Sequence, residues 1–133
     1  MKILYAFIFV LVSFTISAQS IELANSYFVK GEYEKAIQIY RPLFESNPIR
    51  QDYFKSLLTC YQQLEKYEEA QNLLEEQLQR FPNQIYLHVE IGHNYQLQGL
   101  SKLAETEFEK AISYIYEQPG YGFMVGRAFR QNH

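Results

Sequence analysis

The chain has 133 residues, of which 47% are hydrophobic, and a formal net charge of -3 at pH 7. This length suits one modest domain, and acidic and basic residues are interspersed without a basic stripe, which argues against a nucleic-acid partner. The single cysteine, Cys60, excludes an internal disulfide. It lies in the apolar stretch SLLTCY, where a lone thiol is usually a small core residue rather than a nucleophile.

The first eighteen residues are typical of a secretory signal peptide. Lys2 precedes an apolar run over residues 3–12, and small residues lead up to Ala18. Because the run is shorter than the roughly 20 residues that span a bilayer, we expect cleavage after Ala18, with no stable membrane insertion afterwards, in preference to the alternative that the segment is kept as an anchor. The mature domain would be residues 19–133, exported to a bacterial periplasm or cell envelope.

From residue 23 onward, the same pattern of small and apolar residues recurs every 34 residues. The alanines Ala36, Ala70 and Ala104 are separated by this spacing, with no insertion. The spacing also relates further sets of residues: Leu23, Leu57, Ile91 and Val125; Tyr27, Tyr61, Tyr95 and Phe129; Tyr40, Leu74 and Phe108. Such regularity indicates an array of stacked structural units.

Each repeat is predicted to contain two antiparallel helices, because its apolar residues recur at spacings of three and four. Gly31 and Gly99 can end the first helix in a left-handed conformation, and Pro48 and Pro82 close the second. The third repeat has Tyr116 where a closing proline is expected. The predicted units cover about residues 17–50, 51–84 and 85–118.

These residues resemble the tetratricopeptide repeat (TPR) family, whose unit is a 34-residue helix-turn-helix. In that family's pattern, the first helix carries an aliphatic, a small and an aromatic residue. The second helix carries a small residue, a large apolar residue and a closing proline. In the first repeat these six positions are Leu23, Ala24, Tyr27, Ala36, Tyr40 and Pro48. The resemblance implies an all-α fold, a right-handed α-solenoid of TPR hairpins with three units and the first helix of a fourth.

The last fifteen residues, 119–133, read as that first helix of a fourth unit. The 34-residue shift aligns Gly126 with Gly92 and Phe129 with Tyr95. The helix is either a cap on the third unit or the beginning of a longer solenoid, and its three glycines, poor helix formers, favour the second alternative.

No sequence pattern points to catalysis. There is no phosphate-binding glycine loop, nucleophile motif or paired-histidine motif. His88 and His93 are five residues apart, which does not place them on one helical face. The acidic run over residues 65–76 is typical of a solvent-exposed helix face. We therefore predict no catalytic residue, no cofactor and no metal site.

The resemblance implies a concave groove lined by the first helix of each unit. The residues carried onto that groove are Asn25, Phe28, Lys55, Thr59, Gln62, Tyr86, Val89, His93, Gln96, Arg127 and Arg130. The expected function is that of a noncatalytic scaffold, which binds a protein or peptide partner. Two alternatives remain open: an N-terminal docking or sensory module of a longer envelope signalling protein or enzyme, and a solenoid that self-associates through its exposed end.

Overall fold

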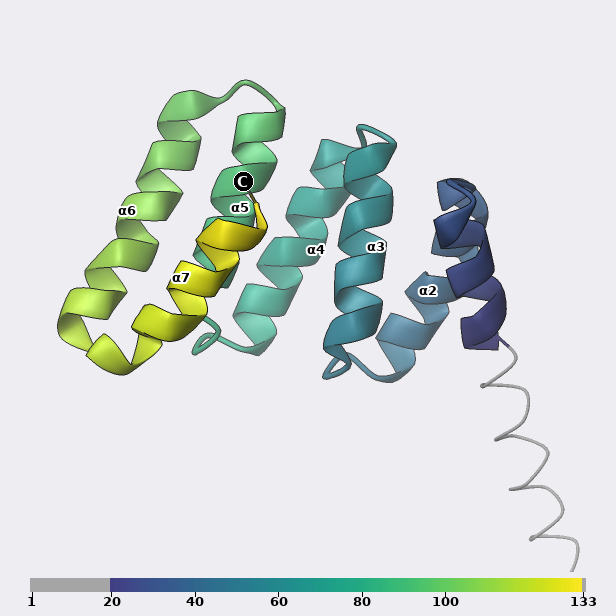
Figure 1. Cartoon of the computed structure of the whole chain (residues 1–133), viewed down its shortest axis with the longest axis horizontal. Helices are drawn as coiled ribbons and strands as arrows, with labels where there is room; N and C mark the ends of the chain where they lie inside the picture. The colour runs from purple at the N-terminus through teal and green to yellow at the C-terminus, as the bar shows by residue number, and fades with distance from the viewer. Residues whose placement is uncertain (1–19, 133) are drawn as a thin grey trace, which may run out of the picture. The chain divides into compact units, whose positions relative to one another are not determined.

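A computed structural model of the chain describes residues 20–132, which form only helices and the short connections between them (Figure 1). The helices cover residues 20–29, α2 (Tyr33–Ser46), α3 (Gln51–Gln63), α4 (Tyr67–Arg80), α5 (Leu87–Leu97), α6 (Ser101–Glu117) and α7 (Gly122–Gln131), with a 3-10 turn, η1 (Pro119–Tyr121), before α7. The all-α expectation is confirmed. The predicted signal peptide, residues 1–18, lies outside the described residues. Over residues 20–132, no helix has the length and apolar character needed to cross a bilayer.

The predicted 34-residue spacing is visible in where the helices begin. α2, α4 and α6 begin at residues 33, 67 and 101. The turn before each contains a left-handed residue at an equivalent position: Gly31 with φ 74°, Glu65 with φ 56° and Gly99 with φ 73°. The left-handed conformation of Glu65 was not predicted, because glutamate gives no sequence signal for it.

Prolines end the second helix of each hairpin, including the third. The residues before these three closing prolines, Asn47, Phe81 and Gln118, leave the helical region, with φ between -132° and -146° and ψ between 73° and 89°, whereas Pro42 lies inside α2. Steric conflict with the proline ring disfavours the α conformation there. The third hairpin therefore has its closing proline at Pro119, three residues after Tyr116, and α6 has 17 residues where α2 and α4 have 14.

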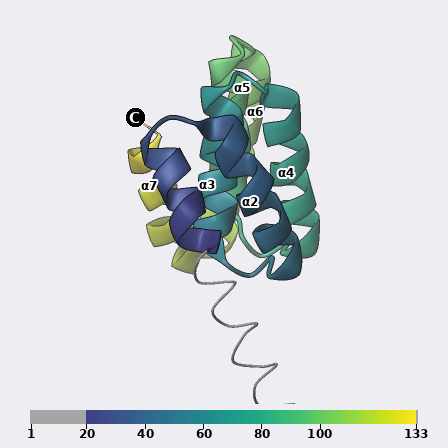
Figure 2. The same cartoon turned by 90° about the vertical axis from the view of Figure 1, so that its right-hand side faces the viewer.

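The chain divides into two compact units, the first ending at Leu64 and the second starting at Glu65. The first contains the helix over residues 20–29, α2 and α3. Figure 2 shows the chain turning back between the helix over residues 20–29 and α2. Aromatic rings form much of this core: Phe44 of α2 and Phe54 of α3, both fully buried, have ring centroids 6.1 Å apart. Ala24 and Ala36 are also fully buried, as expected for small residues where helices meet.

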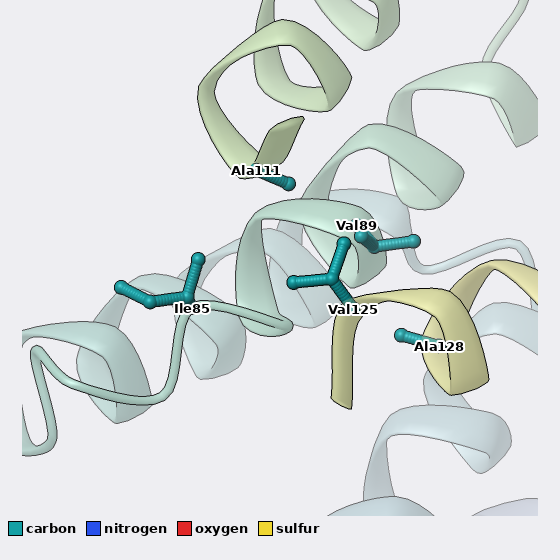
Figure 3. Packing of buried hydrophobic residues seen from close by; sticks show 5 residues of the cluster. All are labelled: Ile85, Val89, Ala111, Val125 and Ala128. Atoms are coloured by element: carbon teal, nitrogen blue, oxygen red, sulfur yellow. The ribbon is translucent and has the colours of Figure 1, made fainter. Parts of the chain in front are cut away.

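The second unit contains α4, α5, α6, η1 and α7. Its best-defined apolar cluster is drawn from four different segments (Figure 3), and its members are Ile85, Val89, Ala111, Val125 and Ala128. Figure 3 shows Val125 of α7 beside Val89 of α5, with Ala128 one turn further along α7. α7 therefore packs on the third hairpin, as the prediction of a fourth-unit first helix requires.

Candidate protein-interaction surfaces

On α3, in the first unit, three predicted site residues form one stripe. Lys55, Thr59 and Gln62 are spaced by four and three residues, which places them on one face of the helix. Lys55 is exposed, and Thr59 and Gln62 are half-buried. Phe54 and Leu57 of the same helix are fully buried. The stripe is therefore accessible, polar and carried by a helix that is anchored in the core.

The predicted site residues Asn25 and Phe28 belong to the first hairpin. The Tyr40 hydroxyl donates a hydrogen bond of 2.6 Å to Oδ1 of Asn25. Phe28 is half-buried and meets the Tyr40 ring edge-on, at a centroid distance of 6.3 Å. Burial raises the pKa of Tyr40, while a hydrogen bond with Ser56 opposes the shift. The hydroxyl therefore stays protonated at neutral pH, and it fixes Asn25 in one orientation at the surface.

In the second unit, Tyr86 and Glu90 of the α5 region lie close to α7. The Tyr86 hydroxyl donates to Oε1 of Gln84 at 3.1 Å, and burial, with Glu90 nearby, raises the pKa of Tyr86 to about 12. Glu90 is buried, and its Oε2 accepts a 3.2 Å hydrogen bond from Nδ2 of Asn132. The same Nδ2 atom donates to the carbonyl of Ala128 at 3.1 Å. Asn132 thus fixes the C-terminal end of α7 against α5.

The expectation that Val89 lines an open groove is wrong. Val89 is fully buried, and the α7 residues Val125 and Ala128 belong to the same cluster. The resemblance to the TPR family placed Val89 on the inner face of α5, but the packing of α7 makes that position part of the core. Of the other predicted residues on α5, His93 is half-buried and Gln96 is exposed.

The two predicted arginines lie on the accessible side of α7. Arg127 and Arg130 are both exposed. The guanidinium carbon of Arg127 lies 6.0 Å from the ring centroid of Phe123, an arrangement in which a cation is attracted to the ring face.

A polar network between α5 and α6 was not predicted. Nδ1 of His88 is 2.7 Å from Oε2 of Glu107, and the His88 ring stacks on Tyr114 with centroids 5.7 Å apart. Lys110 donates to the other carboxylate oxygen of Glu107 at 2.5 Å. Burial acts to raise the pKa of Glu107, but the hydrogen bonds from Lys110 and His88 outweigh it, and the net pKa is lowered. The network ties the two helices of the third hairpin together.

A second unpredicted polar contact ties α4 to α5. Asn94 is fully buried, and its Nδ2 donates to the carbonyl of Tyr67 at 3.0 Å and to Oε1 of Gln71 at 3.1 Å. A buried amide that is satisfied in this way fixes the relative position of two helices. The sequence shows a polar residue at this core position, but it does not show which residues Asn94 contacts.

The described residues offer little for catalysis or metal binding. Cys60 is fully buried, and burial raises its pKa to about 11, so the thiolate is scarce at neutral pH. Among residues 20–132, no three histidine, cysteine, aspartate or glutamate side chains gather in a way that would hold a metal ion.

Comparison with known proteins agrees with the repeat architecture. A sequence model of the family described as anaphase-promoting complex, cyclosome, subunit 3 (ANAPC3) matches residues 10–77. A search of the curated proteins gave no significant match.

Several solved structures share the fold. The Yersinia enterocolitica type III secretion translocator chaperone SycD is 18% identical, with a TM-score of 0.66 and coverage of 87% of each chain. PcrH from Pseudomonas aeruginosa is 22% identical, with a TM-score of 0.64, covering 87% of this chain and 88% of PcrH. PcrH in complex with the chaperone binding region of PopB gives the same identity and TM-score, covering 87% of this chain and 94% of the other. At these identities the likeness shows the fold alone, an α-solenoid of TPR-like helical hairpins.

Proposed function

Because the chain belongs to the TPR-like repeat family described as anaphase-promoting complex, cyclosome, subunit 3, we propose that it is a noncatalytic scaffold that binds a protein or peptide partner. The observation that carries this proposal is the polar stripe of Lys55, Thr59 and Gln62 on a helix with a buried opposite face. Proteins of the same fold support it. PcrH has been solved with the chaperone binding regions of PopB and PopD, and a CopN–Scc3 complex also matches this chain.

The α3 stripe has the chemistry needed to hold a chain segment. Thr59 and Gln62 have side chains of the type that can hydrogen-bond the backbone of a partner, and Lys55 carries a positive charge. These side chains sit on a helix that does not have to fold on binding, so less conformational entropy is lost. We propose that the stripe contacts the partner directly and that Lys55 pairs with a partner carboxylate.

In the second unit, the accessible residues that remain from the predicted set form a second candidate contact. Tyr86 and His93 are half-buried, and Gln96 is exposed. An aromatic side chain with its hydroxyl engaged by Gln84 is a rigid anchor of the kind that dominates binding energy. We propose that this contact recognises an apolar or aromatic side chain of the partner.

The test begins with affinity capture by the full chain from an envelope extract. The captured protein is then purified and titrated calorimetrically against the wild-type chain and against the triple variant Lys55→Glu, Thr59→Ala, Gln62→Ala. Loss of about 2 kcal/mol in binding, or roughly thirtyfold in affinity, is expected from removing a central contact.

A matched control variant contains one Lys→Glu charge reversal, as the triple variant does. Lys30→Glu with Gln38→Ala changes two exposed residues of the same unit outside the stripe. It should bind as the wild type does. If the control loses affinity and the triple variant keeps it, the α3 stripe is not the binding surface.

We also propose that the protein is exported and works in the periplasm or cell envelope. The support is the sequence of residues 1–18, with its basic start, short apolar run and small residues before Ala18. Mass spectrometry of the protein from fractionated cells should find an N-terminus at Gln19 in the envelope or periplasmic fraction. A cytoplasmic protein that retains Met1 would contradict the proposal.

A further inference from the structure

The accessible face of α7 is basic and apolar. Phe123 is 72% exposed, and Arg127 and Arg130 are exposed as well. The sequence of the helix, GFMVGRAFRQ, contains no acidic residue. A large exposed aromatic ring beside two arginines is a typical composition for the centre of a protein interface.

The same helix contains an open glycine position. On α5, Gly92 is covered by the ring of Phe108: a Cβ atom added to Gly92 would lie 2.3 Å from Phe108 Cε1. Gly126 is the equivalent residue on α7, 34 positions later. Among the described residues, leaving out the two chain neighbours and the nearby helix backbone, only Nη1 of Arg130, at 3.9 Å, lies within 4 Å of a Cβ added to Gly126. Gly92 on α5 is therefore in contact with a large side chain, whereas the equivalent Gly126 on α7 is not covered in this way.

The outer side of α6, in the same unit, has the complementary composition. Glu105, Glu109, Ile112 and Tyr116 are spaced by four, three and four residues, so they form one stripe along the helix. All four are exposed, and Tyr116 is 84% exposed. This stripe is named the α6 stripe. Exposed Lys102 lies one turn before Glu105 on the same face, the two glutamates follow it, and the end of the stripe is apolar.

We propose that two copies of this chain associate through these surfaces, with α7 of each copy packing on the α6 stripe of the other. A basic, apolar face and an acidic, apolar face on one unit are mutually complementary in a two-fold pair, because each copy then supplies both halves of the contact. An apolar side chain of the α6 stripe covers Gly126, and Arg127 and Arg130 face Glu105 and Glu109. The apolar contacts supply most of the affinity, and the charges fix the register.

Sedimentation velocity on the full chain tests the proposal, from about 1 to 100 μM. The wild type should show a concentration-dependent dimer. Arg127→Glu/Arg130→Glu and Glu105→Arg/Glu109→Arg should each sediment as monomers with unchanged helical circular dichroism, since each places like charges together. An equimolar mixture of the two variants should recover the dimer, because opposite charges face each other again at both contacts.

The control reverses two exposed acids of α4, Glu68→Arg/Glu69→Arg, and should dimerise like the wild type. A wild type that stays monomeric over the whole range overturns the proposal. A dimer that survives both reversals, or a mixture of folded variants that stays monomeric, overturns it as well.

Gly126→Leu gives an independent test of the open position. Among the described residues that are not its chain neighbours, only the Arg130 side chain lies within 4 Å of an added Cβ, so leucine should leave the monomer at least as stable to heat, while it fills the space that the second copy needs. The dimer dissociation constant should rise at least tenfold. An unchanged dissociation constant in a normally folded variant would exclude Gly126 from the contact and overturn the proposed packing.

Discussion

The first and third hairpins share their spacing and their turn, but their helices are held together by different chemistry. In the first, the Tyr40 hydroxyl donates to Asn25 across the hairpin at 2.6 Å. In the third, the residue 68 positions later is Phe108, which has no hydroxyl, and its ring instead covers Gly92. The repeat thus preserves where a large ring sits, while the residue opposite decides whether the contact is polar or is one of close apolar packing.

The largest expected effect comes from filling the space under Phe108. In Gly92→Leu, the side chain would collide with the ring, which also contacts Phe129 at a centroid distance of 5.3 Å. Overpacking of this kind should lower the free energy of unfolding by about 3 kcal/mol. Urea denaturation measures the loss.

Two further variants show whether the ring is the cause. Gly126→Leu places the same residue at the equivalent position on α7, where no aromatic ring of the described residues lies within 4 Å of an added Cβ, and should cost little. Adding Phe108→Ala to Gly92→Leu should restore part of the lost stability. If Gly92→Leu is as stable as the wild type, the third hairpin is not held together by this close approach.

A smaller effect is expected in the first hairpin when it is made chemically like the third. Tyr40→Phe removes the hydrogen bond to Asn25 and should lower the free energy of unfolding by about 1 kcal/mol. Because the hydroxyl also bonds Ser56, a double-mutant cycle with Asn25→Ala is needed to isolate the Tyr40–Asn25 pair. Additive single-variant effects would show that this pair does not stabilise the hairpin.

The repeat spacing predicted the hairpins and α7, but not the contacts that depend on side chains from two helices. Gly92 and the alanines were identified because small residues recur at fixed positions. Val89 was misplaced because its burial depends on Val125, which reaches it only once α7 is docked. The His88–Glu107 pair was missed because it depends on how α5 and α6 are rotated relative to each other, which a spacing rule does not specify.

The comparison of the turns can be extended to the turn before α4. Glu65 adopts φ 56° where Gly31 and Gly99 adopt 74° and 73°. A side chain in this region is strained, so Glu65→Gly should raise the free energy of unfolding by about 0.7 kcal/mol, while Gly31→Ala should lower it by a similar amount. Thermal denaturation of the two variants decides the matter: a less stable Glu65→Gly would mean that the Glu65 side chain contributes more than its backbone strain costs.

The smallest expected effect is a difference between the first and third hairpins in how their stability depends on pH. Hydrogen bonds from Lys110 and His88 outweigh burial and hold the pKa of Glu107 below its ordinary value of 4.5. A depressed pKa in the folded state means that this stabilisation is present above about pH 4.5 and is lost as the pH falls through the lower, folded-state value. Because Lys110 is half exposed, its ion pair with Glu107 contributes only about 0.5 kcal/mol.

Glu107→Gln should therefore flatten the dependence of stability on pH below pH 4.5. Tyr40→Phe should leave the shape of this dependence unchanged, since Tyr40 titrates far above this range. Equal acid sensitivity in the wild type and Glu107→Gln would assign the acid loss to other carboxylates and leave the third hairpin dependent on the Gly92–Phe108 contact.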